Sequence, residues 1–378
     1  MKYYIKASSI FLEDSIINDA YLEIVNGKFG QISSNPDNNF EIIDYSDKII
    51  APGFVDTHIH GSFDCDIMDK KTENVIKMSE NLINFGVTSF LPTTLTDSIE
   101  NTKEACKCVY EASQKTNGAK IQGIFLEGPF FTEKYKGAQN PKFFVEPDIK
   151  YINDWQSTCG NLIKKVSVAP EIKNAVKFTK DVTNNGLSCA LGHSAATYDE
   201  ARACLNAGAN IFVHTFNGMS PLHHREPGMV GAALESDAYL EVICDGHHLN
   251  KACINIIKKC TGSNKLILVT DCMRAGGMPE GMYNLGEFDV TVKDGTARLS
   301  SGSLAGSILT MNKAVENMVN FGIASLFEAV KMATINPARS AKIDNLCGKI
   351  TIGNDADFVI LNKDATLSNV YLNGIKRK

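Results

Sequence analysis

The feature that most constrains the fold is a regular alternation of apolar, strand-like segments with amphipathic, helix-like segments through the middle of the 378-residue chain. Such alternation is typical of α/β proteins with a parallel sheet. The expected strands are residues 49–60, 86–93, 120–127, 165–169, 187–193, 210–215, 239–245 and 265–271. This number of units favours closure into a (β/α)8 barrel. An open, doubly wound sheet also alternates, but no GxGxxG motif opens the first unit.

The two ends of the chain instead contain short strands separated by turn signals. Asn26-Gly27 is a strong hairpin turn near the start, and residues 348–374 again alternate strands with turns. Neither end is long enough to form a core by itself. We therefore expect residues 1–50 and 344–378 to be the two halves of one small β-sandwich, and residues 51–343 to be the barrel.

The composition disfavours several classes of function. A formal net charge of −5 with no basic tract disfavours nucleic acid as a partner. No apolar run reaches the length of a membrane span, and the N-terminus lacks the layout of a signal peptide. The 11 cysteines are scattered without a CxxC motif, which favours free thiols in a reducing compartment. We expect a soluble, cytoplasmic protein that acts on a small molecule.

Ionisable side chains stand at the ends of most of the expected barrel strands. Two histidines that are two residues apart on a strand point to the same side. Charged groups at the end of a buried strand are costly unless they are paired or bound to a metal. Barrel enzymes carry their reactive groups at this end. The residues in question are His58, His60, Glu127, His193, His214 and Asp271.

The distribution of histidines supports a functional site. A single histidine is more often a hydrogen-bonded core or surface residue than a ligand. Here all 8 histidines fall between positions 58 and 248, and the four that are not at strand ends form the pairs His223-His224 and His247-His248. Such clustering favours a metal centre, because imidazole is the commonest protein ligand of zinc and iron.

The motifs around these residues resemble the amidohydrolase superfamily, and within it the deacetylases of N-acetylglucosamine 6-phosphate. The resemblance is carried in family order by residues 52–61, 126–130, 136–141, 192–194, 214–220, 223–228, 245–248, 269–271 and 304–307. It implies hydrolysis of the N-acetyl group of N-acetylglucosamine 6-phosphate to glucosamine 6-phosphate and acetate. The family is usually dimeric, so the resemblance also implies a homodimer.

The expected metal centre follows from the donor types. Glu127 with the neutral imidazoles of His193 and His214 makes a three-ligand site with an open position, the form that catalytic sites take. His58 and His60 could hold a second metal that shares Glu127, and the resemblance supports two metals. Zinc and iron both suit these ligands. Asp271 is not needed as a ligand and can act as general base and acid.

The remaining assignments concern the substrate. Arg225 is the natural bidentate partner for a phosphate, with a surface ion pair to Glu226 as the alternative. The resemblance assigns substrate contacts to Ala138, Gln139, Asn217, Gly218, His248, Leu304, Ala305 and Gly306. The choice of His248 over His247 rests on alignment alone. Some relatives carry histidine at the position of Gln139, and glutamine can donate a hydrogen bond but not a proton.

Three rival interpretations remain. Cyclic-amide hydrolases of the same fold bridge their metals with a carboxylated lysine at the end of the fourth strand, whereas Lys164 and Lys165 stand at its beginning. No lysine is therefore placed to bridge two metals, and Glu127 would have to bridge them instead, which argues against this rival. A deacetylase of another N-acyl amino sugar is harder to exclude. A non-catalytic relative would be expected to lose ligands first, and this chain keeps the complete set.

Overall fold

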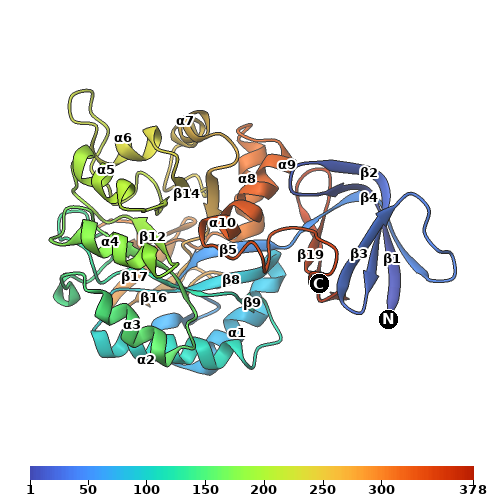
Figure 1. Ribbon diagram of the computed structural model, residues 1–378, viewed down its shortest axis with the longest axis horizontal. Helices are drawn as coiled ribbons and strands as arrows, with labels where there is room; N and C mark the ends of the chain where they lie inside the picture. The colour runs from blue at the N-terminus through green and yellow to red at the C-terminus, as the bar shows by residue number, and fades with distance from the viewer.

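A parallel barrel forms the centre of the computed structural model, which describes all residues from 1 to 378 (Figure 1). Its strands are β5 (Phe54–Ile59), β8 (Val87–Thr94), β10 (Ile124–Leu126), β11 (Ile163–Val168), β12 (Ser188–Leu191), β13 (Ile211–Phe212), β14 (Tyr239–Ile243) and β15 (Leu266–Val269). They pair in chain order, with the short β9 (Lys120–Ile121) also on β8. A parallel bridge between Ile59 and Cys272 brings the last strand back to the first. The predicted (β/α)8 barrel is therefore confirmed.

Helices cover the outside of the barrel. They are α1 (Thr72–Leu82), α2 (Ile99–Ser113), α3 (Ile149–Thr158), α4 (Ala175–Asn184), α5 (Tyr198–Asn206), α6 (Gly228–Glu235), α7 (Lys251–Thr261), α8 (Met311–Asn320), α9 (Leu326–Met332) and α10 (Ile335–Ser340). Helix α2 shows why such segments fold this way. The Ser98 hydroxyl caps its first turn, and residues at helical spacing, including Ala105, Val109 and Ala112, are buried against the strands. Strands and helices share one core of 71 buried residues. No helix is long and apolar enough to cross a membrane.

The expected strand 49–60 is divided between two sheets. Its first part belongs to β4 (Glu41–Pro52), in the terminal sheet, and its second part is β5 of the barrel. The division falls at Gly53, where a Cβ atom would lie only 2.0 Å from the Thr88 hydroxyl. Only glycine lets the chain pass so close to the neighbouring strand.

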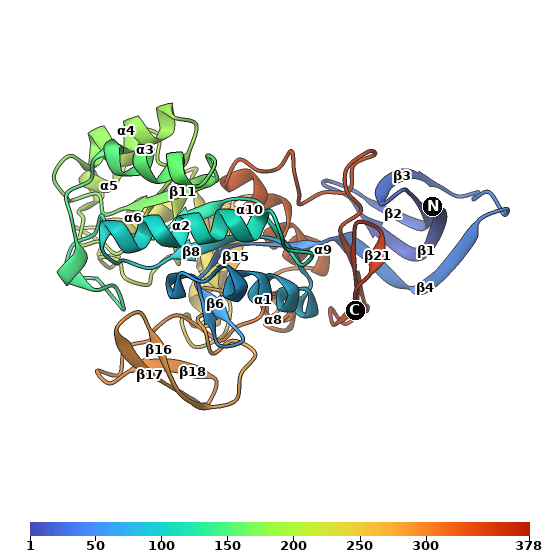
Figure 2. The same ribbon diagram turned by 90° about the horizontal axis from the view of Figure 1, so that it is seen from below.

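Strands from both termini form one separate sheet beside the barrel, drawn in blue and red in Figure 2. Its order is β21 (Ile375–Lys376), β20 (Leu367–Leu372), β19 (Phe358–Leu361), β4, β1 (Lys2–Phe11), β2 (Ile16–Val25) and β3 (Lys28–Ser33). The expected union of the two termini is confirmed. The sheet folds over on itself, because Lys28 at the start of β3 bridges to Asp355 just before β19. The enclosed core of 13 residues includes Ile5, Leu22 and Phe358.

A small antiparallel sheet follows β15, at the bottom of Figure 2. It contains β16 (Gly281–Leu285), β17 (Phe288–Lys293) and β18 (Thr296–Leu299). We call it the mouth sheet, because it packs on loops that follow the barrel strands, through Leu285 against Leu95 and Ala138. The sequence analysis did not predict this element. Short pieces of local structure complete the chain: β6 (Gly61–Ser62), β7 (Cys65–Asp66), η1 (Ile67–Asp69), η2 (Ile83–Phe85) and η3 (Pro141–Phe143).

Candidate metal centre and active site

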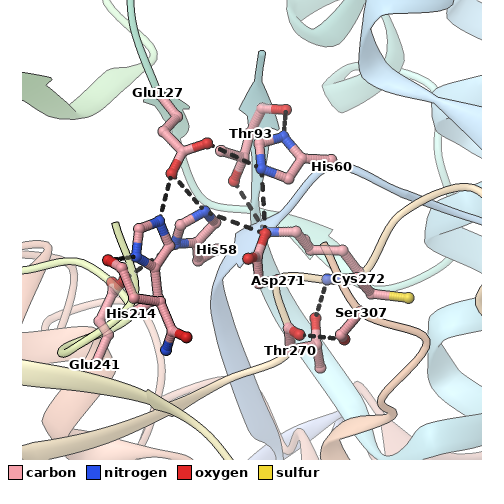
Figure 3. A network of polar contacts seen from close by, with 12 residues as sticks. His58, His60, Thr93, Glu127, His214, Glu241, Thr270, Asp271, Cys272 and Ser307 are labelled. Carbon is pink, nitrogen blue, oxygen red and sulfur yellow. Dashed lines mark hydrogen bonds and ion pairs between the residues drawn. The ribbon is translucent and has the colours of Figure 1, made fainter. Parts of the chain in front are cut away.

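The six ionisable residues predicted at strand ends meet at one end of the barrel, and Figure 3 labels all of them except His193. All six are buried: His58, His60, Glu127, His193, His214 and Asp271. His58 is within β5 and His60 directly after it. The other four follow β10, β12, β13 and β15 within two residues of the strand end. A parallel barrel brings the carboxyl ends of all its strands to the same mouth, so residues far apart in the sequence become neighbours.

Glu127 lies at the centre of this cluster. Its Oε1 atom is 3.2 Å from the Nε2 atom of His58, 3.3 Å from that of His193 and 3.2 Å from that of His214. Its Oε2 atom is 3.2 Å from the Nε2 atom of His60. One carboxylate therefore faces four imidazoles, as a bridging ligand between two metals would.

Asp271 lies on the His58–His60 side of the cluster. Its Oδ1 atom is 3.3 Å from His60 Nε2 and 3.5 Å from His58 Nε2. His58, His60 and Asp271 form one set of donors whose ligand atoms all lie within 4.8 Å of one another, and His58, Glu127 and His214 form another. The sequence predicts Asp271 outside the ligand set and His58 in one site only. The geometry places Asp271 within ligand distance and His58 next to both sets.

Hydrogen bonds at Nδ1, the ring nitrogen that faces away from Glu127, orient three of the imidazoles. Nδ1 of His60 is 3.2 Å from the Thr93 carbonyl, Nδ1 of His193 is 3.2 Å from that of Tyr135, and Nδ1 of His214 is 3.1 Å from that of Asn217. Because a carbonyl oxygen only accepts, each Nδ1 carries a hydrogen, and in the neutral ring each Nε2 then keeps its lone pair. This tautomer is the one that binds a metal through Nε2.

These donors fit a divalent metal. His58 Nε2 is buried and makes no hydrogen bond of good geometry, although it lies 3.2 Å from Glu127 Oε1 among the other potential metal ligands. Burial opposes protonation of His58 and His60, but the carboxylates of Glu127 and Asp271 outweigh it and raise their pKa values to about 9 and about 10. Such a cluster favours positive charge between its carboxylates, and a bound cation supplies that charge.

The pKa values of the two carboxylates, Glu127 and Asp271, are lowered instead of raised. Burial opposes their ionisation, but the facing imidazoles outweigh it, lowering the pKa of Asp271 to about 2 and that of Glu127 well below its usual range. Burial and the neighbouring His193 lower the pKa of His214. The cluster therefore presents anionic oxygens together with a neutral imidazole, a donor set that suits zinc or iron.

The backbone is unusual at three of these positions. His193, His214 and Asp271 have φ angles of 47°, 27° and 47°, in the left-handed region that non-glycine residues seldom adopt. Each lies two residues after the end of a barrel strand, so the buried strand that precedes it constrains the backbone. Strained backbone of this kind gathers at functional sites.

A cavity of about 270 Å³ opens beside the cluster. Among the residues predicted to contact substrate, those lining it are Ala138, Gln139, Asn217, Gly218, His248, Leu304 and Gly306. Ala305, between Leu304 and Gly306, does not line the cavity and is buried. Arg225 does not line it either. It is exposed in residues 221–227, which precede α6 and which we call the 221–227 loop, and it has no ion pair with Glu226 or any other residue.

The structure separates the two adjacent histidines that the sequence could not. His248 lines the cavity, and its Nδ1 atom is 2.6 Å from Oδ2 of Asp245. His247 is exposed, beside Gly295 of the mouth sheet. Burial opposes ionisation of Asp245, but His248 and the backbone N–H groups of residues 247 and 248 outweigh it and lower its pKa. Asp245 therefore anchors the ring of His248 as an anionic acceptor.

Gln139 faces the cluster as well as the cavity. Its Nε2 atom donates to Oε2 of Glu127 over 2.6 Å, and its Oε1 atom accepts from the Thr96 amide over 3.0 Å. Both ends of its amide are therefore fixed. The resemblance implies a substrate contact for this side chain, and in the structure its amino group is directed at the central carboxylate at the edge of the cavity.

Sequence reasoning missed some residues around the site. Leu285 and Ser303, which line the cavity, come from the mouth sheet and the turn after it. Glu241 of β14 contacts His58, and Lys165 of β11 pairs with Glu241 inside the barrel. A signal was present for Glu241, because it is the one charged residue of an otherwise apolar strand, whereas Lys165 follows Lys164 in a strand that also contains Ser167. Lys165 is the third residue of β11, in the first half of the strand, and its side chain points into the barrel.

Fold and site together define a metal-dependent hydrolase of the amidohydrolase barrel type. The amidohydrolase family model matches residues 49–376. N-acetylglucosamine-6-phosphate deacetylase of Vibrio furnissii is 39% identical over 327 residues, which are 86% of this chain and 82% of that protein. N-acetylgalactosamine-6-phosphate deacetylase of Escherichia coli O157:H7 is 35% identical over 376 residues, 99% of each chain.

Comparison with solved structures gives the same family as the sequence comparisons. A mutant N-acetyl-D-glucosamine-6-phosphate deacetylase from Mycobacterium smegmatis, in complex with N-acetyl-D-glucosamine-6-phosphate, has a TM-score of 0.92 at 28% identity. The match covers 100% of this chain and 99% of that one. The chain therefore belongs to the amidohydrolase family, in its N-acetylglucosamine-6-phosphate deacetylase branch.

Proposed function

We propose that the protein hydrolyses the N-acetyl group of N-acetylglucosamine 6-phosphate to glucosamine 6-phosphate and acetate. The observation that carries the proposal is the donor cluster, five of whose six residues line one cavity together with polar groups suited to a sugar. The names of the relatives agree with it. A non-catalytic role is disfavoured, because the chain keeps every donor that the chemistry needs.

Two metal sites are proposed within the cluster. Glu127, His193 and His214 would hold one metal, and His58, His60 and Asp271 the other, with Glu127 shared. When bound, zinc or iron supplies Lewis-acid activation of a water molecule and of the amide carbonyl near neutral pH. Each imidazole has an acceptor at Nδ1, so on binding a metal it would keep its hydrogen there and offer Nε2 to the metal.

The proton transfers are assigned to Asp271. Its carboxylate takes a proton from the attacking water as the new C–O bond forms at the acetyl carbon. It then gives that proton to the sugar nitrogen as the C–N bond breaks, so the products are acetate and a free amine. The low pKa of Asp271, about 2, means that it begins the reaction as a carboxylate.

The substrate is held by the cavity wall. His248, anchored by Asp245 through Nδ1, would present Nε2 to the substrate and accept a hydrogen bond from a sugar hydroxyl. Ala138, Asn217, Gly218, Leu304 and Gly306 would contact the sugar and its phosphate, in part through backbone groups. Ala305 would act through the backbone, since its amide bonds to the Ala297 carbonyl and holds the turn.

The phosphate needs a cation that one chain does not place in the cavity, because no lysine or arginine lines it. We propose a homodimer in which the 221–227 loop of each subunit supplies Arg225 to the cavity of the other. The exposure of that loop supports this arrangement: Leu222 is 54% exposed, and Arg225 has no partner within its own chain.

The protein is proposed to work in the cytoplasm. All 11 cysteines are free thiols, and only Cys260 is exposed. Proteins of reducing compartments keep cysteines in this state.

N-acetylgalactosamine 6-phosphate is a second candidate substrate. The relative from E. coli O157:H7 named for that sugar matches 99% of this chain. The two sugars differ only in the configuration at C4, away from the amide, so both would present the same acetyl group to the cluster.

Acetate release from both phosphorylated sugars and from unphosphorylated N-acetylglucosamine tests the proposal. We expect the highest kcat/KM with N-acetylglucosamine 6-phosphate and the lowest with the unphosphorylated sugar. A higher value with the galactose epimer would transfer the assignment to that substrate. Equal values with and without phosphate would contradict the role of Arg225.

A further inference from the structure

A buried ion pair lies against the metal cluster but outside the cavity. Lys165 of β11 and Glu241 of β14 are both 0% exposed, and neither lines the cavity. Glu241 extends from the pair to the metal-ligand cluster, where Figure 3 shows it beside the His58 ring. No step of the proposed reaction uses either residue.

The pair is fully satisfied by its surroundings. One carboxylate oxygen of Glu241 bonds to Lys165, and the other lies 3.0 Å from His58 Nδ1. The Lys165 ammonium also lies 3.4 Å from the Thr57 carbonyl and 3.7 Å from the centre of the Phe125 ring. Isolated buried charges are very costly. The positive charge of Lys165 therefore compensates the buried carboxylate of Glu241, which contacts Nδ1 of His58.

His58 differs from the other three imidazoles in how it is held. The Nδ1 atoms of His60, His193 and His214 each face a backbone carbonyl. His58 alone depends on a side chain for its tautomer and ring orientation. It is also the one imidazole that belongs to both close donor sets. The orientation of this ring therefore affects the cluster more than that of any other.

We propose that the Lys165–Glu241 pair is a positioning device that sets the metal affinity of the His58, His60 and Asp271 site. Glu241 holds His58 with its Nε2 lone pair toward the metal, and Lys165 holds Glu241. The site of Glu127, His193 and His214 keeps its ligands without this pair. The inference rests on the two-metal arrangement proposed above and adds residues that touch neither substrate nor metal.

Paired replacements separate positioning from folding. Lys165→Met with Glu241→Leu removes both charges together, so no unpaired charge is left in the core, and His58 loses its acceptor. Lys165→Met with Glu241→Gln also removes both charges but keeps an amide oxygen for His58. Lys313→Met with Glu316→Leu is the matched control. It removes a lysine and a buried carboxylate that pair on α8, away from the cluster.

The readout is the pair of zinc dissociation constants, obtained by competition with a chromophoric chelator in the absence of substrate. We expect the leucine variant to bind the weaker zinc about 10- to 100-fold less tightly, with a smaller loss at the tighter zinc, whose ligands Glu127, His193 and His214 are held without Glu241. The glutamine variant should recover part of that loss, and the control should match the wild type. Thermal unfolding of the metal-free proteins checks that each variant is folded.

Two results would overturn the inference. In the first, the leucine variant is folded and binds both zinc ions with wild-type constants. In the second, the wild-type protein binds only one zinc. Because no substrate is present, a failure of the proposed deacetylation would leave this measurement unaffected, and the two proposals can fail separately.

Discussion

Glu127 and Asp271 show what single residues contribute to the site. Glu127 faces all four imidazoles, whereas Asp271 faces only His58 and His60. One carboxylate is therefore suited to hold metals together, and the other has an oxygen left for water and substrate. This difference gives Asp271 a role that can be removed without emptying the Glu127 site.

We predict that Asp271→Asn lowers kcat by about 10²- to 10⁴-fold, because asparagine keeps the shape but cannot take up a proton. Acetate release and metal content, measured on the same preparation, check this. At least one tightly bound metal should remain on Glu127, His193 and His214. Near wild-type turnover by the variant would mean that another group carries the proton.

The site residues differ in how well the sequence predicted them. The six donors were predictable because each is an ionisable residue that ends an apolar run. Lys165 and Glu241 were missed because their inward direction depends on the tilt of barrel strands, which a sequence pattern does not specify. Arg225 was named for its chemistry, but its place on an exposed loop depends on how that loop folds.

At the scale of elements, helix α9 illustrates how a helix end is stabilised by charge. Ser325 and Glu328 form a capping box, and Glu328 also pairs with Lys258 of α7 over 3.0 Å. Burial opposes ionisation of Glu328, but hydrogen bonds from Ser263, the Ser325 amide and Lys258 outweigh it and lower its pKa to about 2.

We predict that Glu328→Gln lowers the free energy of unfolding by about 1 kcal/mol at neutral pH, because glutamine keeps the capping hydrogen bond but loses the charge. The folded-state pKa is depressed, so the contribution is complete above the ordinary pKa of 4.5 and is lost as pH falls toward 2. Denaturation of both proteins at pH 7 and at pH 3 checks this. A difference that grows on acidification would contradict it.

The mouth sheet was the element that the sequence analysis did not predict. It lies outside the strand–helix alternation, and its strands pair only with one another. Leu285 fixes it in place, being 1% exposed within a cluster that includes Leu95, Met273 and Val290. The barrel strands were predictable because the same pattern recurs, whereas a single insertion has no repeat to reveal it.

We predict that Leu285→Ala lowers the free energy of unfolding by about 2 to 4 kcal/mol, through lost burial and the cavity left behind. Met282→Ala, on the same strand, is the control, because Met282 is 66% exposed and should change stability by less than about 0.5 kcal/mol. Chemical denaturation of the two variants gives the comparison. Equal effects would show that Leu285 does not anchor the sheet.

At the scale of the whole molecule, the open question is the source of the phosphate-binding charge. A two-fold dimer is reciprocal, so each subunit gives to its partner what it receives. Arg225→Ala alone should lower kcat/KM for the phosphorylated sugar about 10- to 100-fold, the value of a hydrogen bond to a charged group. Turnover of the unphosphorylated sugar should stay the same.

Mixing the Arg225→Ala and Asp271→Asn proteins tests whether the residue is shared. After subunit exchange, about half of the dimers are mixed, and each contains one site with Asp271 from its own chain and Arg225 of the partner subunit. We expect about a quarter of the wild-type activity to return. No recovery, with exchange demonstrated by a tagged subunit, would place Arg225 in its own chain's site or away from the site altogether.

The central claim is that the protein is a metal-dependent deacetylase of N-acetylglucosamine 6-phosphate. The most direct test measures acetate release from that sugar by the purified protein as isolated, after removal of metal by a chelator, and after zinc or iron is added back. The account predicts turnover that disappears with the metal and returns with it. Metal-loaded protein that releases no acetate from this sugar would contradict the account.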